Sequence, residues 1–367
     1  MTGNDGSVAD LGEWGVIAAL RARMPAGPLT SVGIGDDAAV VGAPSGNVVA
    51  AVDMLIEGRH FLRDWSSAYD IGVKAAARSL SDIAAMGAVN TALLVALAAP
   101  GTLPASWAAE LADGLAAEAT RAGAGIAGGD TARADYVTLA VTALGDLAGR
   151  LPVLRSGARP GDVVAVAGLL GHSAAGLALL MSGVLTPPAA TGGAPASVPP
   201  TVSPVIPPAS VPPADAAAAP PAQAPAPAPD DALAGLVAAH LRPAPIYEAG
   251  PEAALLGATA MIDISDGLIA DLGHIATASG VQVNISTPGL PIAPALLKAA
   301  KALPSTSGTT ALEWVLTGGE DHALVAAFPP SVTLPPRWHP IGEVREGTGV
   351  TVDNATHAGP GGWQHFR

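Results

Sequence analysis

The chain has 367 residues, of which 50% are hydrophobic and only 3% aromatic, and its formal net charge is −14 at pH 7. This length allows two domains, while the acidic balance argues against nucleic acid as the main partner, because a phosphate backbone needs a basic surface. The absence of cysteine excludes disulfides and thiolate metal sites. The N-terminus is unlike a signal peptide and no apolar run is long enough to span a bilayer, so we expect a cytoplasmic protein without a membrane partner.

Strand and helix patterns alternate along the first part of the chain. The predicted elements are a buried strand at 47–52, a helix at 68–86, a strand at 91–98, a helix at 104–122 and a strand at 136–147. The turn-rich sequence RSGARPGD at 155–162 then marks a junction. We therefore expect an N-terminal domain at 1–150 and a C-terminal domain at 151–367.

The C-terminal part repeats this alternation. The predicted elements are a strand at 163–167, a helix from residue 171, a strand at 260–264, a helix at 267–279, and strands at 281–285, 323–328, 338–344 and 350–352. Strands and helices in this order predict an α/β fold with mixed sheets in both domains.

Residues 186–230 differ from the rest, because they consist almost entirely of Pro, Ala, Ser, Val, Thr and Gly. A segment of this composition cannot bury a core, so we predict a disordered insertion with polyproline II character. A tolerated surface loop is a better interpretation than a partner-docking segment. The flanking sequences both have helical patterns, which places the insertion within a helix–helix connection of the C-terminal domain.

Acidic residues recur beside glycine or at the ends of apolar runs. They are Asp36 and Asp37 in GIGDD, Asp53 in AAVDM, Asp82 in SLSDIAAMG, Asp130 in AGGDT, Asp263 and Asp266 in DISDG, and Glu320 and Asp321 in GGED. A buried charge without a partner costs several kcal/mol. Carboxylates in glycine-lined turns are instead good ligands for Mg²⁺, which brings phosphates with it. The pattern predicts metal-dependent nucleotide chemistry.

Each motif also has a structural interpretation when taken alone. GIGDD is compatible with an Asp-rich β-turn, and His60 in EGRHF is more often a structural or surface histidine. Asp82 shares a helix face with Lys74 and Arg78, as an ordinary surface pair would. A surface pair does not explain why an acid stands among alanine and glycine.

The sequence DISDG combines two such interpretations. Period-two alternation places Asp263 and Ser265 on one face of a strand, and Ser265 or Asp266 is expected to cap the helix that follows. Capping leaves Asp263 unexplained. Any one of these motifs is weak support for a site, whereas all of them in one chain are strong support.

The motifs in this order, GIGDD, EGRHF, SLSDIAAMGA, GGDT, RSGARPGD, DISDGL with DLGH, and GGED, resemble thiamine-monophosphate kinase. That family lies in the superfamily of aminoimidazole ribonucleotide synthetase. The resemblance runs from about Leu11 to the aromatic tail GGWQHF, apart from the 186–230 insertion. It implies the two-domain fold of that superfamily and a homodimer formed through the N-terminal domain.

The resemblance further implies ATP-dependent phosphorylation of thiamine monophosphate to thiamine diphosphate with several Mg²⁺ ions. The acceptor phosphate is already largely a dianion at neutral pH, so the transfer needs no general base and is expected to be direct and in line. The resemblance implies six Mg²⁺ ligands, Asp37, Asp53, Asp82, Asp130, Asp263 and Asp266, and gives a catalytic role to two of them, Asp130 and Asp266. It places Gly129, Asp130, Arg155 and Ser265 at ATP. It places His60, Glu320 and Trp363 at thiamine phosphate.

One departure from the family concerns the metal ligands. Ala51 and Val52 stand where hydroxyl residues are common, which makes the number of bound Mg²⁺ ions an open question.

Two alternatives remain at this point. The first is a sister enzyme: aminoimidazole ribonucleotide synthetase, selenophosphate synthetase or the hydrogenase-maturation dehydratase, of which the last two are expected to carry a cysteine. The second is a degenerate binding or scaffold protein.

Overall fold

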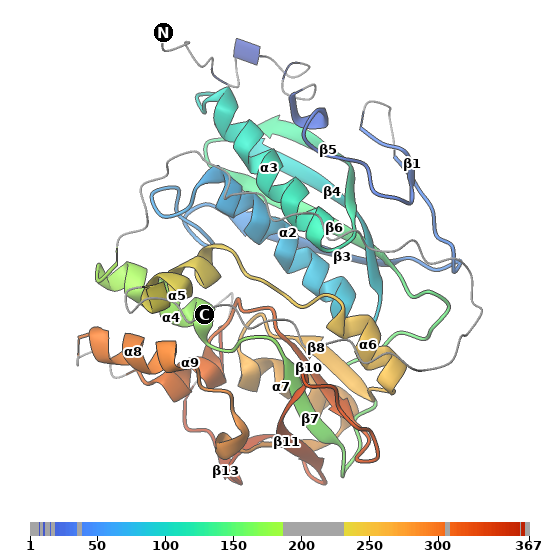
Figure 1. Cartoon of the computed structure of the whole chain (residues 1–367), viewed down its shortest axis with the longest axis vertical. Helices are drawn as coiled ribbons and strands as arrows, with labels where there is room; N and C mark the ends of the chain where they lie inside the picture. Colours follow the sequence, from blue (N-terminus) through green and yellow to red (C-terminus); the bar gives the residue numbers. More distant parts are fainter. Residues whose placement is uncertain are drawn as a thin grey trace, which may run out of the picture.

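The computed structural model describes residues 7, 10–11, 15, 19–34, 39–185, 231–304, 309–359 and 361–363. The expected metal ligand Asp37, its neighbour Asp36 and the 186–230 insertion lie outside these residues. The described part contains two large mixed sheets with helices between and around them (Figure 1), which confirms the predicted α/β class with mixed sheets.

A four-stranded sheet forms the N-terminal half. Its order is β3 (Val49–Ile56), β6 (Thr138–Asp146), β4 (Val89–Ala99) and β5 (Gly125–Arg133), and only the β4–β5 pair is parallel. Helices α2 (Ala68–Ala85) and α3 (Ala105–Arg121) pack together on one face of this sheet (Figure 1). A short pair, β1 (Thr30–Val32) and β2 (Val40–Val41), precedes it. The predicted helices and the strands at 91–98 and 136–147 are confirmed to within a few residues.

Two strand predictions in this half are wrong. Asp53 does not end a buried strand but lies within β3, an edge strand paired on one side with β6. One face of β3 stays open, with Val52 64% exposed and Met54 51% exposed. The AGGDTAR sequence, for which no strand was predicted, forms strand β5, because β4 supplies a parallel partner that sequence periodicity cannot reveal.

A seven-stranded sheet forms the C-terminal half. Its order is β13 (Ala355–Thr356), β12 (Gly349–Val352), β9 (Gln282–Ile285), β11 (His339–Arg345), β7 (Val163–Ala167), β10 (Leu324–Phe328) and β8 (Ala260–Asp263). Its helices are α4 (His172–Ser182), α5 (Asp231–Leu241), α6 (Ala249–Leu256), α7 (Leu268–Ser279), α8 (Pro294–Ala302) and α9 (Ala311–Thr317), with a 3₁₀ turn at Thr287–Gly289. Helices α4 and α5 pack against each other, so the helices predicted to flank the insertion are neighbours.

Helix α2 lies between the two sheets. Alternate residues of β7 and β10 point to opposite sides, so that Ala165 and Phe328 join the core around α2, whereas Val164 and Val325 join the core under α4 and α7. Most of α2 is therefore buried on all sides, including its polar residues Lys74, Ser79 and Ser81. A helix buried in this way brings its polar side chains into the interior between the sheets.

Glycine permits the close packing of α2. A Cβ atom on Gly72 would collide with the backbone of α3, and one on Gly114 would collide with the Tyr69 carbonyl group. Ser67 and Asp70 cap the start of α2 reciprocally, with the Ser67 Oγ accepting the Asp70 N–H at 3.1 Å. Small residues at these contacts allow the helix to lie in the middle of the protein.

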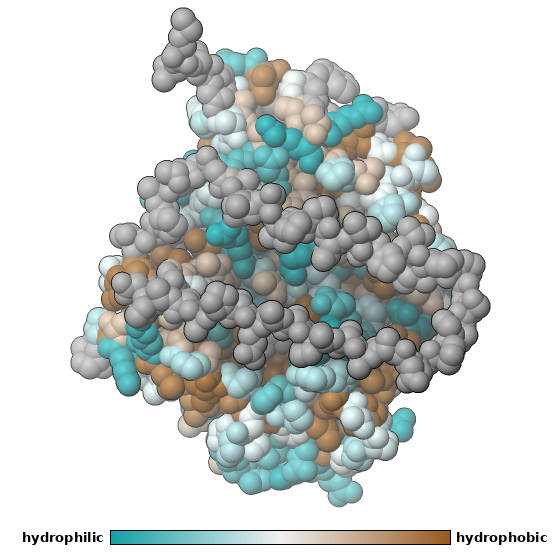
Figure 2. Space-filling view, viewed as in Figure 1, coloured by the Kyte–Doolittle hydropathy of each residue, from teal (hydrophilic) through white to brown (hydrophobic). Residues whose placement is uncertain are grey.

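The surface is mixed in character. Figure 2 shows apolar side chains gathered around α4, α5 and α8, where Met181 is 73% and Leu297 is 51% exposed. Hydrophilic residues gather at the end of the seven-stranded sheet near β11 and β13 (Figure 2). Within the described part of the chain, the helices are all too short or too polar to cross a membrane.

Candidate active site

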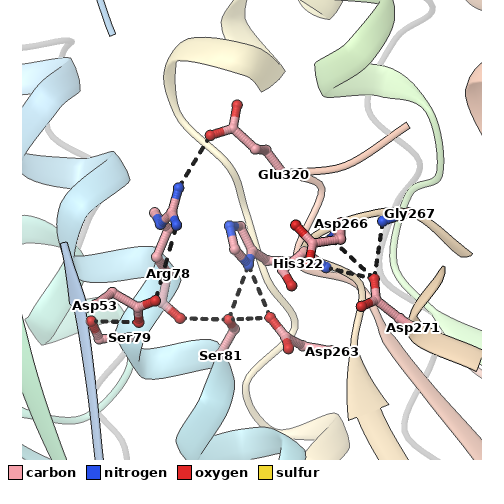
Figure 3. A network of polar contacts seen from close by, with 11 residues as sticks. Asp53, Arg78, Ser79, Ser81, Asp263, Asp266, Gly267, Asp271, Glu320 and His322 are labelled. Carbon is pink, nitrogen blue, oxygen red and sulfur yellow. Dashed lines mark hydrogen bonds and ion pairs between the residues drawn. The ribbon is translucent and has the colours of Figure 1, made fainter. Parts of the chain in front are cut away.

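Three carboxylates meet where α2 crosses between the sheets. Asp53 comes from β3, Asp82 from α2, and Asp263 from the end of β8. Two serines of α2 bind the outer pair: Ser79 Oγ is 3.0 Å from Asp53 Oδ2, and Ser81 Oγ is 2.9 Å from Asp263 Oδ2 (Figure 3). The helix thus connects acids that belong to different sheets.

The carboxyl group of Asp82 has the most strongly raised pKa of this cluster. Burial raises its pKa to about 8, and the charges of Asp263 and Asp53 add to the rise, while the Arg155 guanidinium opposes it. A carboxyl group with this pKa is mostly protonated at neutral pH, because burial and the two neighbouring acids disfavour its ionised form. The cluster is therefore a place where a cation would lower the electrostatic energy.

Asp263 behaves differently although it is more deeply buried than Asp82. Burial would raise its pKa, but hydrogen bonds from His322 and Ser81 and the charge of Arg155 hold it below the ordinary value. His322 Nδ1 lies 3.0 Å from Asp263 Oδ2. Ser81 and Asp263 both approach this same ring nitrogen, so the three residues do not form a hydrolytic triad, which uses both nitrogens of the imidazole.

A second polar group joins α2 to the GGED turn. Glu320 accepts hydrogen bonds from Lys74 Nζ at 3.1 Å and from Arg78 Nη1 at 3.2 Å (Figure 3 shows the Arg78 contact). Burial would raise the pKa of Glu320, but chiefly Lys74, with His240 and Arg78, lowers it to about 2. Burial and the Lys74 charge lower the pKa of His240 to about 3, so this imidazole is neutral.

These contacts correct the interpretation of Asp82 as half of a surface ion pair. Arg78 pairs with Glu320 and lies 4.0 Å from Asp53, and Lys74 pairs with Glu320. Lys74 and Arg78 do lie on one face of α2, but their acidic partners come from other elements.

The backbone of the GGED turn is unusual. Glu320 and His322 have φ angles of +65° and +53°, in the left-handed region that non-glycine residues rarely adopt. Asp321 between them accepts the Ser173 N–H at 2.8 Å and so caps α4 from a distant segment. Non-glycine residues held in this region are typical of functional sites.

The start of α7 is held by Asp271. Its Oδ2 accepts the N–H groups of Ser265, Asp266 and Gly267 at 3.0, 3.1 and 3.0 Å (Figure 3). The predicted cap by Ser265 or Asp266 is wrong, because Gly267 occupies the cap position and makes no side-chain bond. The predicted shared strand face is also wrong, because β8 ends at Asp263 before Ser265.

We expect Asp271→Ala to destabilise the protein by about 2–3 kcal/mol, because three backbone donors lose a buried acceptor. Urea unfolding of the purified variant measures this loss. Asp271→Asn keeps one acceptor oxygen and should recover part of the stability. Equal stability of wild type and Asp271→Ala would show that this carboxylate does not hold the loop.

Residues 361–363 pack beside this loop. The Trp363 N–H donates to the Asp266 carbonyl oxygen at 2.9 Å, and the Ala270 N–H donates to the Gly361 carbonyl oxygen at 3.0 Å. Trp363 is 62% exposed. Trp363 therefore lies at the edge of the acidic site, next to the predicted metal ligand Asp266.

Other predicted residues lie apart from the cluster. The register Asp53–Val141–Val95–Gly129 crosses the whole four-stranded sheet. Gly129 and Asp130 are consequently three strand spacings from Asp53, roughly 14 Å. His60 lies in the turn after β3, where its Nδ1 accepts the Ile56 N–H at 3.0 Å.

The carboxylates fit a divalent cation. Asp53, Asp82 and Asp263 are hard oxygen donors, and burial together with the charges of Asp263 and Asp53 raises the pKa of Asp82, so a bound cation would favour its ionised form. In the part of the chain that the structure describes, no group of three or more acidic or histidine side chains is arranged to hold a metal ion by itself. Mg²⁺ commonly binds through one or two carboxylates together with water and phosphate oxygens, so two of these carboxylates with a bound phosphate would be enough.

Sequence reasoning missed several residues of the site. Ser79 and Ser81 carry a weak signal, as hydroxyls beside Asp82 in an alanine-rich helix. His322 and Asp271 carry less, since each gains its meaning from a partner brought close by folding. The cationic partners of Glu320 on α2 were seen in the sequence but not assigned to it.

The chain is similar to known proteins over its length. Residues 35–147 match the family described as AIR synthase related protein, N-terminal domain. The thiamine-monophosphate kinase of Mycobacterium tuberculosis (strain CDC 1551 / Oshkosh) is 43% identical over 377 residues, covering 100% of this chain and 97% of its own.

Two solved structures are similar across nearly the whole chain. The crystal structure of thiamine-monophosphate kinase from Stenotrophomonas maltophilia K279a superimposes with a TM-score of 0.72 at 30% identity, covering 94% of this chain and 97% of its own. AaThiL complexed with AMPPCP and TMP gives a TM-score of 0.69 at 29% identity, covering 97% and 98%. The chain belongs to the thiamine-monophosphate kinase family.

Proposed function

We propose that this chain transfers the γ-phosphoryl group of ATP to thiamine monophosphate, forming thiamine diphosphate. The observation that carries the proposal is the meeting of Asp53, Asp82 and Asp263 at the junction of the sheets. Family membership supports the same reaction, because a structural relative was solved with AMPPCP, an ATP analogue, and TMP. Membership also favours this reaction over those of the sister enzymes and over a scaffold protein.

We propose Mg²⁺ as the cofactor of the acidic cluster. When bound, Mg²⁺ would neutralise phosphate charge and favour an in-line displacement. Asp53, Asp82 and Asp263 would hold it, with Ser79 and Ser81 fixing the orientation of the outer two carboxylates. Asp266 extends the donor set at the start of α7 and is proposed as a catalytic residue.

Nucleotide and acceptor would lie around this cluster. Arg155 is close enough to favour the ionised forms of Asp82 and Asp263, which supports its role at ATP, and Ser265 stands in the loop held by Asp271. Trp363 and His60 are proposed to contact thiamine phosphate, the former by stacking on a cationic ring. The roles of Gly129, Asp130 and Asp37 remain predictions from the resemblance.

Glu320 is proposed to contact thiamine phosphate, but not chiefly through the attraction of its negative charge to the cationic substrate. Lys74 and Arg78 already bind its two carboxylate oxygens, so its charge is largely compensated. We infer that Glu320 helps to position thiamine phosphate more than it attracts the substrate by its net charge.

We also propose a homodimer and a cytoplasmic location. The open face of the four-stranded sheet carries exposed Val52 and Met54, and apolar surface of this kind favours association with a second copy. The reaction partners, ATP and thiamine monophosphate, are small molecules, which agrees with the acidic chain having no nucleic-acid partner. The N-terminal domain at 1–150 would then carry the dimer contact and part of the ATP site, and 151–367 the rest.

The test is ADP formation from MgATP with thiamine monophosphate, free thiamine or an aminoimidazole-pathway substrate as acceptor, with the product identified by mass spectrometry. We expect thiamine diphosphate only from the monophosphate, and a loss of about a thousandfold in turnover for Asp53→Asn. ADP formation stimulated by another acceptor would contradict the proposal.

Asp130→Asn adds an independent arm to this experiment. Asp130 lies on β5, at the opposite edge of the four-stranded sheet from Asp53 on β3. A loss comparable with that of Asp53→Asn would support Asp130 as a ligand of the same reaction centre. Wild-type turnover in Asp130→Asn would remove Asp130 from the site and leave the reaction itself unaffected.

A further inference from the structure

His322 is held by both its backbone and its ring at the end of β8. Its N–H donates to the Ile264 carbonyl oxygen at 2.9 Å, and its Nδ1 lies 3.0 Å from Asp263 Oδ2. The residue is 2% exposed and Asp263 is 4% exposed. An imidazole with these contacts has little freedom to turn away from the carboxylate.

The protons of this arrangement can be assigned from the donor set. An ionised Asp263 can only accept hydrogen bonds, so the facing His322 Nδ1 carries a hydrogen. Ser81 Oγ shares its one hydrogen between Asp263 Oδ2, at 2.9 Å, and the Arg78 carbonyl oxygen, at 2.7 Å. Both donors reach Oδ2. The second oxygen, Oδ1, is thereby left for another ligand.

The left-handed backbone of His322, with φ at +53°, serves this placement. A residue held in that region costs conformational energy, which the fold tolerates where the position of a side chain matters. The neighbouring residue Leu324 pairs with Asp263 in the β10–β8 register, so the turn and the acid are fixed to each other through the sheet.

A further observation concerns the other ring nitrogen. His322 Nε2 is buried without a hydrogen-bond partner among the described residues, and so is Arg78 Nε of α2. A hydrogen-bond partner from a bound substrate or water would satisfy Nε2, as buried polar atoms require.

We propose that His322 is a positioning residue that, together with Ser81, fixes Asp263 Oδ2 and thereby presents Oδ1 to the metal ion. The inference rests on the proposed metal-dependent function. It extends that function to two residues, one from each half of the chain, whose role is to orient a metal ligand. Hydrogen bonds to ligating carboxylates typically change metal affinity by about 10–100-fold.

The test compares three variants with wild type for Mn²⁺ binding, measured by electron paramagnetic resonance on the full chain without acceptor. His322→Leu removes the N–H and should weaken Mn²⁺ binding at least tenfold. His322→Asn places an amide donor near the former Nδ1 and tolerates the left-handed backbone, so it should retain affinity to within about threefold. Ser81→Ala, which keeps a good helix former in α2, should weaken binding by a smaller factor.

Turnover gives a second readout. The Mg²⁺ concentration for half-maximal activity should rise at least tenfold in His322→Leu. His172→Leu is the matched control, since this half-buried imidazole faces the Leu170 carbonyl oxygen at 3.1 Å and lies outside the cluster. Melting temperatures separate loss of folding from loss of binding.

The outcomes are distinct. Unchanged Mn²⁺ affinity in folded His322→Leu and Ser81→Ala would overturn the inference, and so would equal losses in the Asn and Leu variants. If no acceptor supports turnover but the Mn²⁺ affinities still follow the expected order, the proposed reaction fails while the positioning role stands.

Discussion

Asp82→Asn is expected to lose about a thousandfold in turnover and to make the metal-free protein more stable. The loss follows from removing a charged oxygen from the Mg²⁺ site, whose contribution to transition-state stabilisation is several kcal/mol. The gain follows because asparagine removes the carboxyl group whose pKa is raised to about 8 by burial and by the charges of Asp263 and Asp53. One substitution should therefore separate stability from activity.

The sign of the pH dependence follows from proton binding. The Asp82 carboxyl has a pKa of about 8 in the folded chain against an ordinary value of 3.8, so between these values the folded state binds more protons than the unfolded state. Its contribution to stability falls as pH rises from about 4 to about 8 and is constant above that. The advantage of Asp82→Asn over wild type should grow across the same window and reach a few kcal/mol by pH 8.

Urea unfolding with EDTA at several pH values between 5 and 9 measures this advantage, and the coupled ADP assay measures turnover. Asp113→Asn is the control, because Asp113 lies on α3 in a solvent-exposed pair with Arg23. It should change neither quantity appreciably. Wild-type turnover in Asp82→Asn would contradict the role of Asp82 in the metal site. A stability advantage that does not depend on pH would contradict its raised pKa.

Glu320→Gln is expected to destabilise the protein by about 3–5 kcal/mol, because it leaves the Lys74 charge buried without a carboxylate. Lys74 is 2% exposed and has Glu320 as its ion-pair partner at 3.1 Å. Burial already lowers the pKa of Lys74, and Glu320 is what opposes that effect. Chemical denaturation at pH 7 measures the loss.

The double variant Lys74→Met/Glu320→Gln tests the cause. Methionine removes the buried charge, so the double variant should regain part of the stability that Glu320→Gln loses, and the cycle should show a coupling of at least about 1 kcal/mol. Glu313→Gln, which alters a more exposed acid of α9, should change stability by less than about 1 kcal/mol and serves as the control. Additive effects of the two substitutions would contradict a Lys74–Glu320 pair.

The Glu320 carboxylate also makes the stability of the protein depend on pH in the acid range. Glu320 has a pKa of about 2 in the folded chain against 4.5 ordinarily. Its stabilising contribution is therefore complete above about pH 4.5 and is lost as pH falls toward 2. Glu320→Gln should lack this component of acid unfolding.

Local sequence features predicted much of the element order. The alanine-rich pattern of α2, the β-branched pattern of β6 and the helices beside the insertion were recognisable because periodicity reports which face of an element is buried. The prediction failed at β5 and at Asp53, since pairing with a distant strand decided both. It also failed at the start of α7, where Asp271 satisfies the backbone that Ser265 was expected to cap.

The sequence by itself determined which acids the chain carries, the order of its motifs and the family that they resemble. Only the tertiary structure decided their partners. Lys74 and Glu320 are 246 residues apart and Ser81 and Asp263 are 182 residues apart, and no local pattern links such positions. The pairs form because α2 is buried between two sheets, where each polar group must find its partner on another element.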